Sequence, residues 1–123
     1  MAIEQELPEK FLNDTALILA ICFDNALEAT FKIKQEQQQW IKIRIYNDST
    51  YLYIQLENSV VENIIIDAYE IPKTTKTKSQ LHGLGLSQVK KIVELYQGQM
   101  VLSCRDNVFT IGLMIKYHSA AVL

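Results

Sequence analysis

Residues 81–86 read Leu81-His82-Gly83-Leu84-Gly85-Leu86 and carry two glycines, one residue apart, at the start of an amphipathic stretch. The apolar residues that follow recur with the 3.6-residue period of a helix that buries one face. They are Leu86, Val89, Ile92, Val93 and Tyr96. Gly98 comes next and suits the left-handed position that follows a helix end. We therefore expect a helix over 86–96, with both glycines directly before it.

Glycines at a helix N-terminus favour an anion, because free N–H groups and the positive end of the helix dipole lie there. Without a Cβ, they also let the backbone approach a ligand. Five lysines and no acidic residue lie between Ile71 and Val93, whereas the other 100 residues hold 7 basic and 14 acidic side chains. In a chain of net charge −2, this indicates a polyanionic ligand. The alternative is a glycine turn before an ordinary helix, with solvated lysines.

Composition bounds the class of protein. A chain of 123 residues, 49% of them hydrophobic, fits one domain with a sizeable core. Its net charge does not suggest binding to nucleic acid. Cys22 and Cys104 are too few for a disulfide framework and lack zinc-site spacing, which suits a reducing cytoplasm. The longest apolar run, 16–23, is far shorter than the roughly 20 residues that span a bilayer, so we expect no direct membrane contact.

The first predicted helix runs from a cap at Asn13 or Asp14 to about Phe31, and its apolar run indicates a place in the core. Three polar residues near its end share one stripe, because they are three and four positions apart. They are Asp24, Asn25 and Glu28. This stripe is either a solvent-facing strip or part of a binding site.

Two hairpins are predicted from alternating apolar residues. The first pairs 40–46 with 51–56 across the turn Asn47-Asp48-Ser49, and the second pairs 99–104 with 109–115 across Asp106-Asn107. Residues 60–69 fit either a short helix or a strand, and 71–80 read as a long, functional loop. This order predicts an α/β sandwich whose sheet is mixed or mostly antiparallel, with its helices on one face.

Three segments together resemble the GHKL superfamily of ATP-binding domains (the Bergerat fold). Phe23–Ala29 resembles its N-box, Leu56–Ser59 lies where its first glycine box would be, and 82–93 resembles its second glycine box and the helix after it. The likeness is greatest to the catalytic domain of sensor histidine kinases, in the branch of quorum-sensing peptide receptors. It implies a two-layer α+β sandwich of about five strands and about three helices, as a single domain over 1–123 with its core at about 14–115. It also implies that this domain is part of a larger membrane-bound kinase and lies in the cytoplasm.

The resemblance implies roles for individual residues. Asn25 would ligate Mg²⁺, Asn58 would stand in place of the family's adenine-binding Asp, and the glycine N–H groups would hold the phosphates of ATP. Residues 60–80 would form a lid, and His82 would either contact phosphate or only set the conformation of that lid. The nucleotide-binding candidates are Asn25, Glu28, Asn58, Lys76, Lys78, His82, Gly83, Leu84, Gly85, Leu86 and Lys90.

The sequence departs from the family's pattern at two places. The first glycine box normally reads Asp-x-Gly-x-Gly, whereas residues 58–61 here are Asn58-Ser59-Val60-Val61 and contain no glycine. The hydrolysing branch of the family carries a glutamate general base one turn before the Mg²⁺-binding Asn, and that position is Ile21 here, which cannot accept a proton. Transfer of a phosphoryl group to a protein side chain is therefore favoured over hydrolysis of ATP.

The acceptor of such a transfer is not expected on this chain, whose histidines are His82, in the glycine box, and His118. In the family, the accepting histidine lies on a separate helical dimerisation domain, and a response regulator acts downstream. We therefore expect the catalytic domain of a protein-histidine kinase that binds ATP and Mg²⁺ but needs this second domain to react. One alternative is a GHKL-type regulatory module that binds a protein with little or no ATP turnover. Another is an unrelated α/β domain with incidental glycines.

Overall fold

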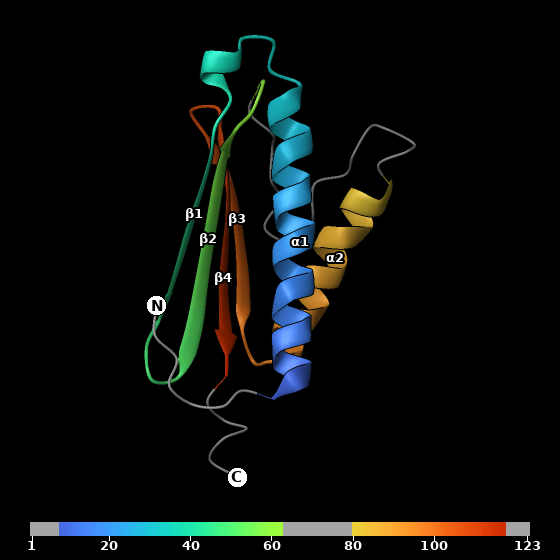
Figure 1. Cartoon of the computed structure of the whole chain (residues 1–123), viewed down its shortest axis with the longest axis vertical. Coiled ribbons are helices and arrows are strands. Elements are labelled where there is room, and N and C mark those ends of the chain that lie inside the picture. Colours follow the sequence, from blue (N-terminus) through green and yellow to red (C-terminus); the bar gives the residue numbers. More distant parts are fainter. Residues whose placement is uncertain (1–7, 63–79, 118–123) are drawn as a thin grey trace.

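The computed structural model describes residues 8–62 and 80–117, and of residues 80–84 the backbone alone. These residues form one sheet with both α-helices on the same face (Figure 1). The elements in chain order are α1 (Glu9–Phe31), the 3₁₀ turn η1 (Glu36–Gln38), β1 (Ile41–Asn47), β2 (Tyr51–Ser59), α2 (Gln80–Leu95), β3 (Gln99–Arg105) and β4 (Val108–Lys116).

The sheet has the order β1-β2-β4-β3, and every neighbouring pair is antiparallel. Both predicted hairpins are confirmed, and they join through β2 and β4, where Leu56 lies opposite Ile111. The described residues thus hold four strands and two α-helices, fewer than the expected five and three, and no parallel pair. Most of the segment that was expected to be a further helix or strand, 60–69, lies outside the described residues.

The predicted turns lie where expected and have a physical basis. Asp48 Oδ1 accepts hydrogen bonds from the backbone N–H groups of Thr50 at 2.8 Å and Tyr51 at 2.7 Å, which closes the first hairpin. Asp106 and Asn107 both have positive φ, 53° and 60°, as a two-residue hairpin turn of the favoured hand requires. Asp and Asn tolerate this conformation better than most residues.

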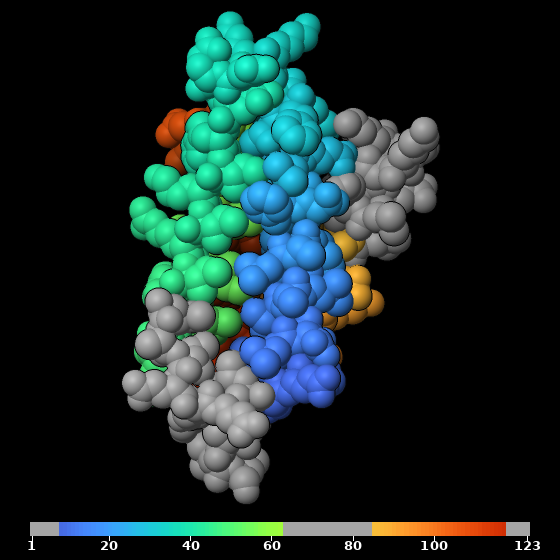
Figure 2. All heavy atoms as spheres, viewed as in Figure 1, coloured from blue at the N-terminus to red at the C-terminus, as the bar shows by residue number. Residues whose placement is uncertain are grey.

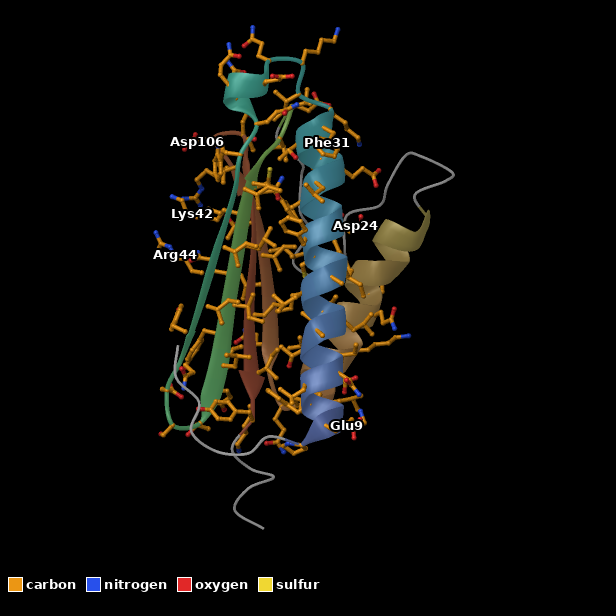
Figure 3. All side chains as sticks on the ribbon, viewed as in Figure 1. Glu9, Asp24, Phe31, Lys42, Arg44 and Asp106 are labelled. Atoms are coloured by element: carbon orange, nitrogen blue, oxygen red, sulfur yellow. The ribbon has the colours of Figure 1, made fainter. Side chains whose placement is uncertain are left out.

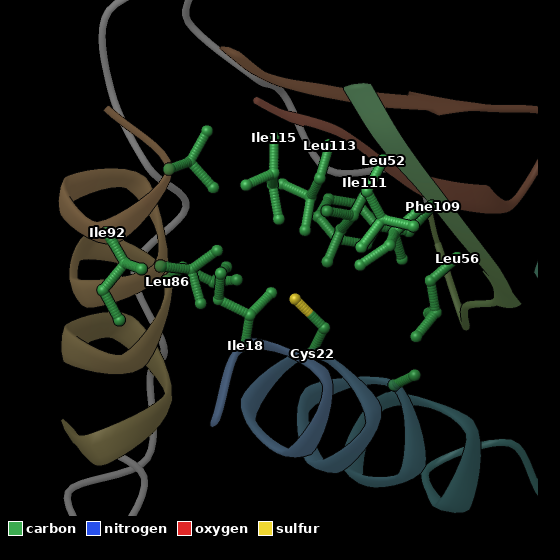
Figure 4. Packing of buried hydrophobic residues seen from close by; sticks show 14 of the residues in the cluster. Ile18, Cys22, Leu52, Leu56, Leu86, Ile92, Phe109, Ile111, Leu113 and Ile115 are labelled. Carbon is green, nitrogen blue, oxygen red and sulfur yellow. The ribbon is translucent and has the colours of Figure 1, made fainter. Parts of the chain in front are cut away.

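The core lies between the sheet and the two helices. Alternate residues of β2 and β4 face the helices and are buried, as are Ile18 and Cys22 of α1 and Leu86 of α2 (Figure 4). Burial of one such aliphatic side chain contributes about 1.5–3 kcal/mol. The sheet residues of this core are Leu52, Ile54, Leu56, Phe109, Ile111, Leu113 and Ile115.

The edge strand β1 is less covered than its sequence predicts. Ile43 and Ile45 lie opposite the buried residues Leu56 and Ile54, and therefore on the core face, yet they are 42% and 37% exposed. The reason is that α1 lies over the middle of the sheet, and a furrow separates it from β1 in Figure 2. Apolar alternation identifies the face of a strand but not how far a helix covers it.

The first helix begins earlier than predicted. It starts at Glu9 after Pro8, with no side-chain cap, so residues 9–13 are helical and neither Asn13 nor Asp14 is the cap. The first turn is held by tertiary contacts instead, because Phe11 is buried and its ring packs edge-on against Tyr96 at 5.2 Å. Neither α1 nor α2 is long and apolar enough to cross a membrane, among the residues that the structure describes.

The second helix also begins earlier than predicted, at Gln80 instead of Leu86. Its end differs in detail too. Gln97, with φ 54°, takes the left-handed position that was assigned to Gly98. The N–H of Gly98 bonds to the carbonyl of Val93 at 2.9 Å, and that of Gln97 to Glu94 at 3.0 Å, which is the Schellman arrangement. Gly98 is needed for a different reason, since a Cβ there would lie 1.9 Å from the carbonyl oxygen of Met114.

Candidate functional site

The end of β2 carries a buried amide with an unused acceptor. Asn58 is fully buried, and its Nδ2 donates to the carbonyl of Ser59 at 3.0 Å. Its Oδ1 has no hydrogen-bond partner among the described residues. A buried acceptor without a partner costs about 1–3 kcal/mol, so such a group is rare unless a ligand or water uses it. Asn58 is therefore a buried acceptor whose donor is not among the described residues.

The backbone around Asn58 is held on both sides. The N–H of Ser59 bonds to the carbonyl of Trp40 at 3.2 Å, and Ser59 Oγ accepts the N–H of Trp40 at 3.1 Å. The N–H of Val60 bonds to the carbonyl of Asn107 at 3.0 Å. The resemblance drew attention to Asn58 and Ser59, but nothing in the sequence indicated that Trp40 would bond to Ser59.

The polar stripe of α1 lies at the same end of the molecule. Figure 1 shows α1 and β2 running in the same direction, so the last turns of α1 and the end of β2 lie together, and α2 begins nearby. Asn25 and Glu28 are half-buried, and Asp24 is exposed on the flank of α1 toward α2 (Figure 3). The stripe is thus not a fully solvated strip, because two of its three residues are partly covered.

The contact between α1 and α2 locates Asn25 relative to the glycines. The Cβ that Gly85 lacks would lie 2.8 Å from Cγ2 of Ile21, so the two helices touch at this point. Asn25 is one helical turn beyond Ile21 on α1. α2 runs antiparallel to α1 in Figure 1, so the first turn of α2 lies toward the C-terminal end of α1, the end that carries Asn25. Asn25 and the free N–H groups at the start of α2 thus lie on the same side of the Ile21–Gly85 contact along the two helices.

The glycines themselves do not precede the helix, as the sequence predicted. Gly83 ends the first turn of α2 and Gly85 lies in the second, where N–H groups bond to carbonyls of the preceding turn. The tertiary contacts of the helix outweigh the low helix propensity of glycine. The N–H groups without a partner inside the helix are thus those at 80–82, a few residues earlier than expected.

The remaining candidates are placed as follows. Lys76 and Lys78, with most of the proposed lid, lie outside the described residues. The side chains of His82 and Leu84 lie outside the description as well, although their backbone is helical. Leu86 points into the core, so only its backbone could contribute to a site (Figure 4). Lys90 is half-buried, two turns beyond Gly83 and about 10 Å further along the helix axis.

The side chains near Asn25 fit a metal ion that takes most of its ligands from water and a bound substrate. Within the described ranges, no three His, Cys, Asp or Glu side chains gather so that they could hold a metal ion. Mg²⁺ usually keeps several waters and binds through one or two protein oxygens together with substrate phosphates. The amide oxygen of Asn25 would be one such protein oxygen.

Comparison with known families decides the relationship. The family described as the GHKL domain matches residues 12–116. This chain belongs to the GHKL family. No curated protein matches it.

Solved structures of histidine kinases share the fold of this GHKL domain. The blue-light activated histidine kinase of Erythrobacter litoralis EL346 matches 95% of this chain with a TM-score of 0.71 at 14% identity, and the chain spans 34% of that protein. The catalytic domain of histidine kinase ThkA, in a nucleotide-free form, matches 85% of this chain and 67% of its own length, with a TM-score of 0.64 at 26% identity. The Acinetobacter baumannii histidine kinase AdeS matches 85% of this chain and 46% of its own, with a TM-score of 0.57 at 17% identity.

Proposed function

We propose that this GHKL domain is the ATP-binding catalytic domain of a sensor histidine kinase, which presents the γ-phosphate of ATP to a histidine on a separate helical dimerisation domain. In this proposal the domain works in the cytoplasm, as part of a membrane sensor that answers a quorum-sensing peptide. The phosphoryl group then passes to a response regulator. The observation that carries the proposal is the unpartnered Oδ1 of Asn58 at the end of β2.

Asn58 suits the amino group of adenine. Its Nδ2 is committed to the carbonyl of Ser59, so the acceptor side of the amide is the side left unused. The 6-amino group of adenine donates, whereas the 6-oxo group of guanine accepts and would face another acceptor. The site thereby favours adenine without the negative charge that an aspartate would bring.

Asn25 and the first turn of α2 suit the phosphates. The amide oxygen of Asn25 is a hard ligand that can complete the shell of a phosphate-bound Mg²⁺. When bound, Mg²⁺ would bridge phosphate oxygens and offset their charge. The free N–H groups of α2 and its dipole would hold phosphate on the other side. Glu28, Lys90 and the lysines of the lid are secondary candidates for the same ligand.

The proposed chemistry needs a second domain. Ile21 occupies the position of the hydrolytic base and packs against α2, so nothing there activates water. With labelled ATP and Mg²⁺, the isolated chain should neither label itself stably nor release phosphate at a useful rate. A dimerisation domain of a related kinase, supplied in cis or in trans, should become labelled on histidine, because it supplies both the nucleophile and proximity. Rapid release of phosphate by the isolated chain would instead indicate an ATPase.

Calorimetric titration with a non-hydrolysable ATP analogue, with and without Mg²⁺, tests the binding step. We expect binding that Mg²⁺ strengthens, and Asn25→Ala should remove most of that strengthening while the fold is retained. Asn47→Ala is a matched control, since it also truncates a half-buried Asn, at the opposite end of the sheet.

The alternative is a regulatory GHKL module that binds a protein instead of turning over ATP. The absence of glycine from residues 58–61 favours it. In the titration, such a module would bind the analogue weakly or without regard to Mg²⁺. Equal binding by wild type and Asn25→Ala would support this alternative and count against the kinase.

A further inference from the structure

We infer that Ile21 and Gly85 are positioning residues, whose contact sets the approach of α1 to α2 and so aligns Asn25 with the first turn of α2. This inference rests on the proposed binding of Mg²⁺–ATP. It assigns a role to Gly85 that differs from direct contact with phosphate, and a role to Ile21 beyond the absence of a general base.

Gly85 is required by space and not by backbone conformation. No described glycine has a positive φ, so an L-residue could adopt the backbone of Gly85. Glycine is also the poorest helix former after proline, and Gly85 lies inside a helix. What excludes a side chain is Ile21, whose Cγ2 would lie 2.8 Å from a Cβ. Two carbon atoms in contact are normally about 3.5–4.0 Å apart, so a Cβ at residue 85 would displace either the Ile21 side chain or one of the two helices.

The other end of the helix pair is held by different residues. The hydroxyl of Tyr96 donates to Asp14 Oδ2 at 2.7 Å, and the ring of Tyr96 packs edge-on against Phe11. α2 is therefore fixed to α1 near its C-terminus and touches α1 again at Gly85. An added methyl group at residue 85 would push the beginning of α2 away from α1 while its end stays in place.

That displacement would act on the phosphate site in particular. Asn25 lies one turn beyond Ile21, on the side of the contact toward the beginning of α2, so a wider gap would separate the proposed Mg²⁺ ligand from the N–H groups proposed to hold phosphate. Asn58 lies at the end of β2, where its neighbours Ser59 and Val60 are bonded to Trp40 and Asn107. Adenine binding should therefore be insensitive to the gap.

The experiment combines Gly85→Ala with two changes at Ile21. Gly85→Ala should lower the affinity for Mg²⁺–ATP about tenfold. Adding Ile21→Ala removes Cγ2 and should restore most of that affinity. Adding Ile21→Val keeps a γ-methyl group on each side and should not restore it. Gly112→Ala is the matched control, because a Cβ there would meet only the carbonyl of Val101, at 3.9 Å.

Binding of adenosine, followed by NMR chemical shifts, separates positioning from general loss of structure. Adenosine lacks phosphates, so its affinity should be the same for wild type and Gly85→Ala. An equal fall for adenosine and Mg²⁺–ATP would overturn the inference, as would a Gly85→Ala protein that binds Mg²⁺–ATP normally or a failure of Ile21→Ala to restore binding. If the wild type itself does not bind Mg²⁺–ATP, the proposed function fails and this inference with it.

Discussion

The hydroxyl of Tyr96 donates a 2.7 Å hydrogen bond to Oδ2 of Asp14, which ties the end of α2 to the beginning of α1 across 82 residues of sequence. Lys10 pairs with the same carboxylate oxygen at 2.8 Å, one turn earlier on α1. Asp14 thus joins the helices at the end of the molecule opposite the candidate site. The two helices need this anchor because the sheet supports each of them along one side only.

Tyr96→Phe should weaken this anchor without emptying the space that the ring fills. The ring contact with Phe11 remains, while one hydrogen bond to a charged group is lost, so we expect the free energy of unfolding to fall by about 1–2 kcal/mol. Urea unfolding measures the change. Tyr53→Phe is the matched control, since its hydroxyl also donates to an aspartate, Asp48, but on the exposed hairpin, where the loss should be smaller. Equal losses of unfolding free energy in the two variants would show that the hydrogen bond of Tyr96 stabilises the fold no more than an exposed one.

The same contacts predict how stability changes with pH. Hydrogen bonds from Lys10 and then Tyr96 hold the pKa of the Asp14 carboxyl below its usual range. A depressed folded-state pKa contributes stability above the unfolded value, and this is lost as the pH falls through the folded value. The free energy of unfolding should therefore begin to decrease near pH 4 and continue to decrease at lower pH.

At alkaline pH, stability is lost as the pH rises and not as it falls. Burial, and next the bond to Asp14, raise the pKa of Tyr96 to about 12. The folded state therefore holds the hydroxyl proton of Tyr96 more tightly than the unfolded chain, in which tyrosine has a pKa of about 10. Stability should fall between about pH 10 and 12, and Tyr96→Phe should remove much of that fall. An identical alkaline limb in the variant would contradict the assignment.

The end of α2 predicts opposite effects for two neighbouring residues. Gln97 is held at φ 54°, which costs an L-residue about 1–2 kcal/mol, so Gln97→Gly should raise the free energy of unfolding by about 1 kcal/mol. Gly98→Ala should lower it by about 3 kcal/mol or more, because the new Cβ would collide with the carbonyl of Met114. Thermal unfolding distinguishes the two. Gln97→Ala, which keeps the strain, should stay close to wild type.

The sequence predicted those features that depend on local periodicity. Alternation located both hairpins, and Asp106-Asn107 located the turn between β3 and β4. It misplaced helix starts, because Phe11 and the contact of Ile21 with Gly85 stabilise turns whose own residues are poor helix signals. At Gly85 the side chain of Ile21 leaves no room for a Cβ. Spacing along the chain does not show this tertiary contact.

The candidate site shows the same division. The polar stripe of the first helix and the resemblance to the GHKL family singled out Asn25 and Asn58, and the structure places them on the last turns of α1 and at the end of β2. The unused acceptor of Asn58 could not be predicted, because it depends on which neighbours bond to its amide. Hydrogen-bond satisfaction is a property of the folded surroundings and leaves no trace in composition.

Asn58→Leu should separate a binding residue from a structural one. Leucine branches at the same atom as asparagine and carries no polar group, so the variant loses the bond to Ser59 but also the unpaired acceptor. Replacing an unsatisfied buried group costs little, and we expect the free energy of unfolding to stay within about 1 kcal/mol of wild type or to rise. ATP affinity should fall at least about tenfold, since adenine loses its acceptor.

Asn47→Leu is the opposite case on the neighbouring strand. Asn47 Nδ2 donates to the hydroxyl of Tyr117 at 3.1 Å, so its loss removes a partner and should destabilise the fold while ATP binding is unchanged. Unfolding and titration of both variants give four measurements. If Asn58→Leu instead unfolds readily and binds ATP like wild type, the buried amide serves the sheet and not a nucleotide.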